Sequence, residues 1–216
     1  LAAAGERFWR WQGERWLDGG PAGALRAVSP AGDWLATVLE GQLTFLGWRS
    51  GRRVVLPPLG SAIGFLTALD RHHALVATVK GPATTLKIAA RRGRWQWETR
   101  LPLAIAALFP GDRAGTVLMW SAQPPTLLVV TFGPYRVQRF DLPAVPTAIA
   151  PMPWGYVLAL AETLQLWDKD GTILGAVALP ERAITLAAIG STHVAIATPT
   201  RLYSLDLRQA NVDLLF

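Results

Sequence analysis

The chain has 216 residues and a formal net charge of +6; 51% of its residues are hydrophobic and 17% are charged. This balance excludes a disordered chain, and the absence of Cys excludes disulfides and thiolate metal sites. The longest nearly charge-free apolar run, residues 101–110, is far shorter than the roughly 18–20 residues that cross a bilayer, so no membrane span is expected.

The first 24 residues predict the end of a repeat unit, with its last two strands at residues 7–11 and 14–17. From residue 25 onward, apolar strands with small side chains recur at residues 34–39, 74–79, 116–120, 156–161 and 193–198. The first residues of these strands are 40, 42, 40 and 37 positions apart. That spacing is typical of the blades of a β-propeller.

The same series of elements follows each recurring strand. A short turn leads to a second strand that opens with Leu, at residues 43, 86, 127, 164 and 202. A third strand then ends in Leu-Pro, at residues 56–57, 101–102, 142–143 and 179–180. Because Pro has no N–H donor, it suits the point where an outer strand leaves its sheet. The inner strand of the next unit follows, as at residues 62–66 and 183–187.

The hydrophobic pattern separates strands buried on both faces from strands at the rim. The middle strands are continuous apolar runs, whereas residues 94–100 and 135–140 alternate with a period of two. We therefore predict an all-β fold, a β-propeller of four-stranded antiparallel blades. It would form a single domain over residues 1–216, with a partial blade at 1–24 and blades that start near residues 25, 62, 104, 145 and 183.

The blade count is predicted as five to six, with six favoured. Residues 1–24 complete a sixth blade, or supply the outer strand that closes the fifth. In a third alternative, the chain is the C-terminal part of a larger ring.

Two local motifs resemble the WD40 repeat family. Residues 27–36 (AVSPAGDWLA) are similar to the turn that follows the inner strand of that repeat, and Leu164–Asp168 is similar to its closing Trp-Asp. The Gly-His dipeptide of the family is missing. With only three His in the chain, the family's Asp-His-Ser/Thr-Trp network cannot recur from blade to blade. The resemblance covers the whole chain as a period and a pattern, and it implies a scaffold that binds other proteins.

Residues suited to catalysis are sparse. Lactonase-like propellers hold a metal with carboxylates and Asn, but this chain has a single Asn and its inner strands are apolar. Asp70, His72 and His73 are interpreted as a solvated turn. No nucleophile elbow, phosphate loop or dinucleotide fingerprint occurs. We therefore expect no enzyme activity, no cofactor and no metal.

Cationic residues gather in the turns of two neighbouring predicted units. If the inner strand of each blade is counted as the first, the turns between first and second strands and between third and fourth strands lie on one face of a propeller. On that face only Asp70 offsets the positive charge. Trp on the adjoining strand would add interface anchors. In the alternative interpretation, the Arg form a solvated rim and the Trp fill the gaps between blades. The predicted partner-binding residues are Arg49, Arg52, Arg53, Arg71, Arg91, Arg92, Arg94, Trp95 and Trp97.

These observations predict a non-catalytic protein–protein interaction scaffold that docks a partner with an acidic surface. The first alternative is a nucleic-acid-binding propeller that uses the same arginines with Trp for base stacking; the second is a metal-dependent hydrolase of the lactonase type. Residues 1–5 lack the basic segment of a signal peptide, so a cytoplasmic location is expected, although the first residue is not Met. The oligomeric state is left open.

Overall fold

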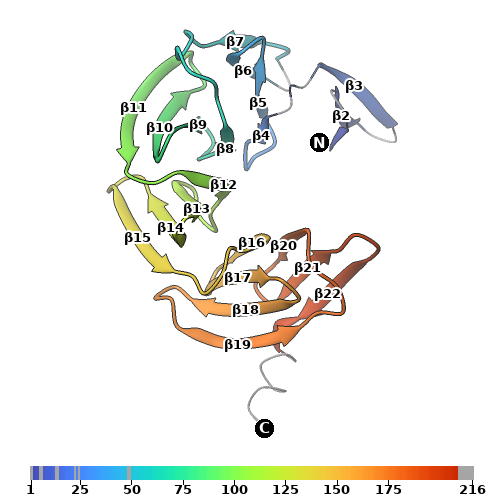
Figure 1. Cartoon of the computed structure of the whole chain (residues 1–216). Helices are drawn as coiled ribbons and strands as arrows, with labels where there is room; N and C mark the ends of the chain where they lie inside the picture. Colours follow the sequence, from blue (N-terminus) through green and yellow to red (C-terminus); the bar gives the residue numbers. More distant parts are fainter. Residues whose placement is uncertain are drawn as a thin grey trace. The chain divides into compact units, whose positions relative to one another are not determined.

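The computed structural model describes residues 23, 25–47 and 50–208 in full, and before them only the backbone of three strands. Strands of the described residues form six sheets, and in each sheet the order of strands in space is their order in the chain (Figure 1). The first sheet has three strands, β1 (Ala2–Ala4), β2 (Arg7–Gln12) and β3 (Arg15–Pro21).

The next three sheets have four strands each. One contains β4 (Arg26–Val28), β5 (Trp34–Leu39), β6 (Gln42–Gly47) and β7 (Arg53–Val55). The following sheet contains β8 (Phe65–Ala68), β9 (His73–Lys80), β10 (Ala83–Ala90) and β11 (Arg94–Leu101). The third contains β12 (Ile105–Pro110), β13 (Thr116–Ala122), β14 (Pro125–Thr131) and β15 (Arg136–Asp141).

Two sheets complete the described fold. One has four strands, β16 (Ala148–Met152), β17 (Gly155–Leu160), β18 (Thr163–Asp168) and β19 (Ile173–Ala178). The last has three, β20 (Thr185–Ile189), β21 (His193–Ala197) and β22 (Leu202–Asp206).

The chain divides into two compact units, one of Leu1–Gln123 with Val129–Val137, the other of Pro124–Leu128 with Gln138–Phe216. Within the first unit, β8 contacts both β4 and β12. Within the second unit, β16 contacts β20. In each unit, therefore, neighbouring sheets meet along their first strands.

Packing between sheets explains why the middle strands are apolar throughout. Large side chains of the sheet β4–β7 meet small side chains of the sheet β8–β11: Trp34 and Phe45 lie in one core cluster with Ala74 and Ala89. Trp34 is 0% exposed, and its ring meets the Phe45 ring edge-on, with 5.0 Å between centroids. Such large-to-small interdigitation buries both faces of a middle strand.

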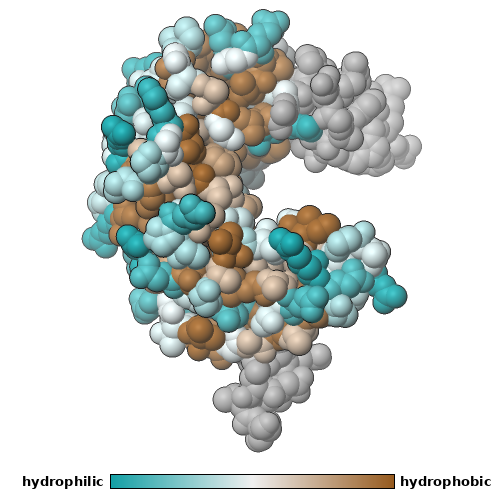
Figure 2. All heavy atoms as spheres, in the orientation of Figure 1, coloured by the Kyte–Doolittle hydropathy of each residue, from teal (hydrophilic) through white to brown (hydrophobic). Residues whose placement is uncertain are grey.

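The burial pattern confirms most of the predicted strands. All residues of β17 are buried, and β11 alternates between exposed and half-buried side chains, with hydrophilic residues on its outward side (Figure 2). The alternation expected over residues 135–140 is wrong. In β15 Phe140 alone is half-buried, and the other side chains of that strand are exposed.

Two inner strands begin later than expected. The strand predicted at residues 62–66 begins at Phe65, and the one predicted at 183–187 begins at Thr185. Before Phe65 the chain turns through Gly60, whose φ of +69° suits glycine. The single domain over residues 1–216 and the five blade starts stay predictions.

Candidate partner-binding pocket

Three turns of the first unit line one pocket of about 520 Å³. They lie between the sheets β4–β7 and β8–β11, at the ends of β6, β8 and β10, and beside the turn that joins β4 to β5. The lining residues are Phe45, Gly47, Ser50, Arg52, Val54, His72, His73, Ala90, Arg91, Arg92, Arg94 and Gln96. Among the described residues, no Asp or Glu lines this pocket.

The pocket has an apolar inner wall and a cationic rim. Phe45 and Ala90 are 1% and 4% exposed, and Val54 is half-buried. Arg52, Arg92 and Arg94 are exposed. No carboxylate in residues 25–47 or 50–208 lies within ion-pair distance of these three guanidinium groups. Within the described part of the chain, therefore, no ion pair offsets their charge.

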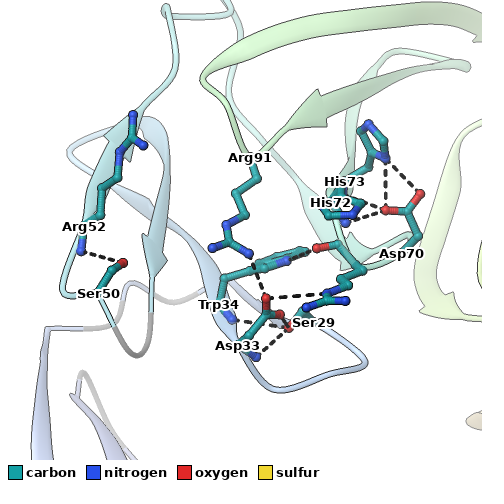
Figure 3. Close-up of polar contacts among 10 residues, drawn as sticks. Ser29, Asp33, Trp34, Ser50, Arg52, Asp70, His72, His73 and Arg91 are labelled. Atoms are coloured by element: carbon teal, nitrogen blue, oxygen red, sulfur yellow. Dashed lines mark hydrogen bonds and ion pairs between the residues drawn. The ribbon is translucent and has the colours of Figure 1, made fainter.

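Arg91 is the exception, because Asp33 of the neighbouring sheet holds it. Its Nη1 donates to Asp33 Oδ2 at 2.8 Å, and the Ser29 hydroxyl donates to Asp33 Oδ1 at 2.7 Å (Figure 3). Arg71 Nε lies 4.0 Å from the same carboxylate. The expectation that Asp70 alone offsets the cationic cluster is thus wrong, because Asp33 comes within reach only when the two sheets pack together.

The environment of Asp33 favours its ionised form. Partial desolvation tends to raise the pKa of this carboxyl group, but hydrogen bonds from Ser29 and Arg91, together with the charge of Arg91, hold the pKa below its ordinary value. The Ser29 hydroxyl also accepts the Asp33 backbone N–H at 3.0 Å. The turn between β4 and β5 therefore presents a fixed anion to Arg91.

Asp70 organises the turn between β8 and β9. Its Oδ1 accepts the backbone N–H groups of His72 and His73 at 2.6 and 2.9 Å, and its Oδ2 lies 2.8 Å from His73 Nδ1 (Figure 3). Partial burial raises the pKa of Asp70, but these hydrogen bonds outweigh it and the pKa is lowered. The prediction of a turn is confirmed.

A pH dependence of stability follows for Asp33. Because its pKa is lower in the folded chain than in the unfolded chain, its ionised form stabilises the fold above about pH 4, and this contribution is lost as the pH falls through the lower folded value. We expect the urea midpoint of Asp33→Asn to fall less than that of the wild type between about pH 5 and pH 3. Asp170→Asn, at an exposed turn, is the control and should track the wild type. An equal slope for Asp33→Asn and wild type would contradict the role of Asp33.

The structure brings together four of the seven predicted arginines, namely Arg52, Arg91, Arg92 and Arg94, and it adds His72 and His73. The exposed Arg53 and Arg71 lie outside the lining. Arg49 lies outside the described residues. Partner binding by any of these side chains stays a prediction.

Trp95 and Trp97 are half-buried and packed within the protein. The Trp95 indole N–H donates to the carbonyl oxygen of Pro57 at 3.1 Å, and its ring packs against the core cluster. The Trp97 ring lies 5.0 Å from the Phe132 ring and 5.2 Å from the Tyr135 ring, measured between centroids. Both contacts favour the alternative interpretation of Trp as packing residues.

Sequence reasoning missed the apolar wall of the pocket. Phe45, Val54 and Ala90 belong to three different strands or strand ends, and each looks like an ordinary core residue in its own segment. The one available signal was that Phe45 and Val54 lie beside the turn that carries Arg52.

Comparison with solved structures identifies the architecture. The chain matches BBS1N, determined in complex with ARL6DN, with a TM-score of 0.63 and 13% identity over 80% of this chain. It matches the CNH domain of AfRom2 with a TM-score of 0.62 and 11% identity over 92% of this chain. Both are propeller folds. The fold is a β-propeller.

The comparisons show the fold alone. The chain spans 60% of the length of BBS1N and 73% of the length of the AfRom2 domain. No protein-family model matches the sequence, and no curated protein matches it significantly, so membership of the WD40 family stays a resemblance.

Neither a cluster of metal ligands nor a membrane-spanning helix occurs among the described residues. No three His, Asp or Glu side chains of the described chain are grouped in a way that could hold a metal ion. The part of the chain that the structure describes contains no helix with the length and apolar character needed to span a bilayer.

Proposed function

We propose that this propeller is a protein-interaction module that docks the acidic surface of a partner at the pocket between the sheets β4–β7 and β8–β11. One observation carries the proposal: four arginines line the pocket and no described carboxylate does. Arginine presents five donors in a planar fork that matches a carboxylate, and it stays charged at every physiological pH.

Similar architectures support a binding role. BBS1N was determined in complex with a protein, ARL6DN, and propellers present their loops and strand ends as a rigid platform. The turn that carries Arg92 is held between the paired strands β10 and β11, so its backbone loses little conformational freedom when a ligand binds.

Nucleic acid is a weaker fit to the same pocket. Single-stranded nucleic acid binds by stacking its bases on exposed aromatic rings beside a basic groove. Phe45 is buried against Trp34, and Trp95 faces the core. The pocket therefore offers cations without an exposed indole or phenyl face.

The proposal is tested with fluorescent poly-glutamate and with single-stranded DNA of equal charge as the competing probe. We expect the wild type to bind poly-glutamate, and the triple variant Arg52→Glu, Arg92→Glu, Arg94→Glu to bind it at least about tenfold more weakly, because like charges repel. Binding should also weaken as salt rises, since exposed charges are screened.

A charge-matched variant separates the pocket from the total charge. Arg100→Glu, Arg136→Glu, Arg182→Glu changes the net charge equally at exposed positions outside the pocket. Its affinity for poly-glutamate should stay close to that of the wild type. An equal loss in both triple variants, or tighter binding of DNA than of poly-glutamate, would refute docking at this pocket.

A further inference from the structure

The pocket combines a cationic rim with an apolar wall, and a rim that only interacts with solvent needs no apolar wall. The buried side chains of Phe45 and Ala90, together with Val54, line the same space as the exposed arginines. Because Phe45 and Ala90 are buried, the half-buried Val54 is the part of this wall that a ligand can cover, and a ligand that used only the arginines would leave Val54 in contact with water. The pocket is therefore complementary to a ligand that has both an apolar group and anionic groups.

The size of the pocket limits the ligand. Its volume of about 520 Å³ is that of a site for a small molecule or a few side chains. A flat interface between two folded proteins instead buries roughly 800 Å² on each partner. A recess of this size accepts a short segment more readily than the face of a folded domain.

The charges are arranged around the apolar wall rather than on one side of it. Arg52 comes from the turn before β7. Arg92 and Arg94 come from the other sheet, Arg92 from the turn before β11 and Arg94 from the first position of β11. A peptide whose central side chain enters the recess would place anionic side chains before and after it near both groups of arginines. The hydrogen bond from Arg91 to Asp33 links the two sheets beside the pocket.

We infer that the ligand is a short acidic peptide segment of a partner protein, with one aliphatic side chain flanked on both sides by Glu or Asp. The aliphatic side chain packs chiefly on Val54, and the flanking carboxylates pair with Arg52, Arg92 and Arg94. This inference rests on the proposed function and names the chemistry of the partner at the same pocket.

The test uses the full chain and three fluorescein-labelled peptides, read by fluorescence anisotropy. The first has a central Leu with two Glu on each side, the second has Ser in place of that Leu, and the third has Gln in place of every Glu. We expect the Leu peptide to bind about tenfold more tightly than the Ser peptide, since burial of the aliphatic group is lost. The Gln peptide should bind at least about tenfold more weakly than the Leu peptide, because its pairing with arginine is lost.

A protein variant locates the aliphatic side chain. Val54→Asn places a polar group on the apolar wall and should weaken binding of the Leu peptide while leaving the Ser peptide unchanged. If thermal melting shows that this variant is unfolded, Val54→Ala replaces it. The comparison of the three peptides on the wild type needs no variant at all.

The outcomes separate the inference from the proposed function. Equal affinity for the Leu and Ser peptides, with poly-glutamate still bound at the pocket, would overturn the inference and leave the proposed function standing. Loss of pocket-dependent poly-glutamate binding would overturn both. Displacement of the Leu peptide by equimolar single-stranded DNA would also count against a peptide ligand.

Discussion

Trp34→Ala should destabilise the protein by about 3–5 kcal/mol, as is typical when a fully buried aromatic side chain is truncated in a packed core. Trp34 is 0% exposed and lies against Phe45 and the small residues of the facing sheet. Its indole N–H donates to the carbonyl oxygen of Arg71 at 2.6 Å, which ties the sheet β4–β7 to the turn between β8 and β9. Urea denaturation followed by circular dichroism measures the loss.

Two variants divide this effect into packing and hydrogen bonding. Trp34→Phe keeps an aromatic ring but removes the donor to Arg71, and it should cost less than the alanine variant. Trp95→Ala removes a half-buried indole from the same pair of sheets and should also cost less. A Trp34→Ala variant no less stable than Trp95→Ala would contradict the position of Trp34 at the centre of this core.

Gly155→Ala should destabilise the protein by about 3 kcal/mol through overpacking, although it adds a single methyl group. Gly155 begins β17 and pairs with Asp168 of β18. A Cβ at this position would overlap the backbone carbonyl oxygen of Trp167, and backbone in a paired strand cannot move aside as a flexible side chain can. The change is measured by the same urea titration.

Gly64→Ala is the matched control. A Cβ at Gly64 would lie 3.6 Å from the carbonyl oxygen of Ala77, which is an ordinary contact, and its φ is not in the left-handed region. Alanine also restricts the unfolded chain, so this variant should be neutral or slightly more stable than the wild type. Similar losses for Gly155→Ala and Gly64→Ala would show that the close approach of β17 and β18 is not rigid.

Strand positions could be predicted where the local pattern was strong. The strand predicted at residues 34–39 is observed with those bounds as β5, and continuous apolar runs mark β13 and β17 because both faces of these strands are covered. The start of β8 was misplaced because residues 62–64 are apolar or small, like the strand that follows them. Nothing in their pattern shows that the strand has not yet begun there.

The candidate pocket could be predicted in part. The arginines stand out because turns at equivalent points of two neighbouring repeats carry Arg52, Arg91 and Arg92, and a repeat places equivalent points on one face. The pairing of Asp33 with Arg91 joins residues 58 positions apart and depends on the distance between two sheets. The residue pattern within one segment gives no information about the distance between two sheets.

By itself, the sequence determined the all-β class, the period of about forty residues and the positive charge of one set of turns. These properties depend on hydrophobic period and residue type, which each segment carries independently of the others. Only the tertiary structure decided that those arginines surround an apolar recess, that Asp33 neutralises one of them, and that Trp95 and Trp97 serve packing. These properties depend on which faces two sheets bury against each other, and that contact is set by the fit of side chains between the sheets.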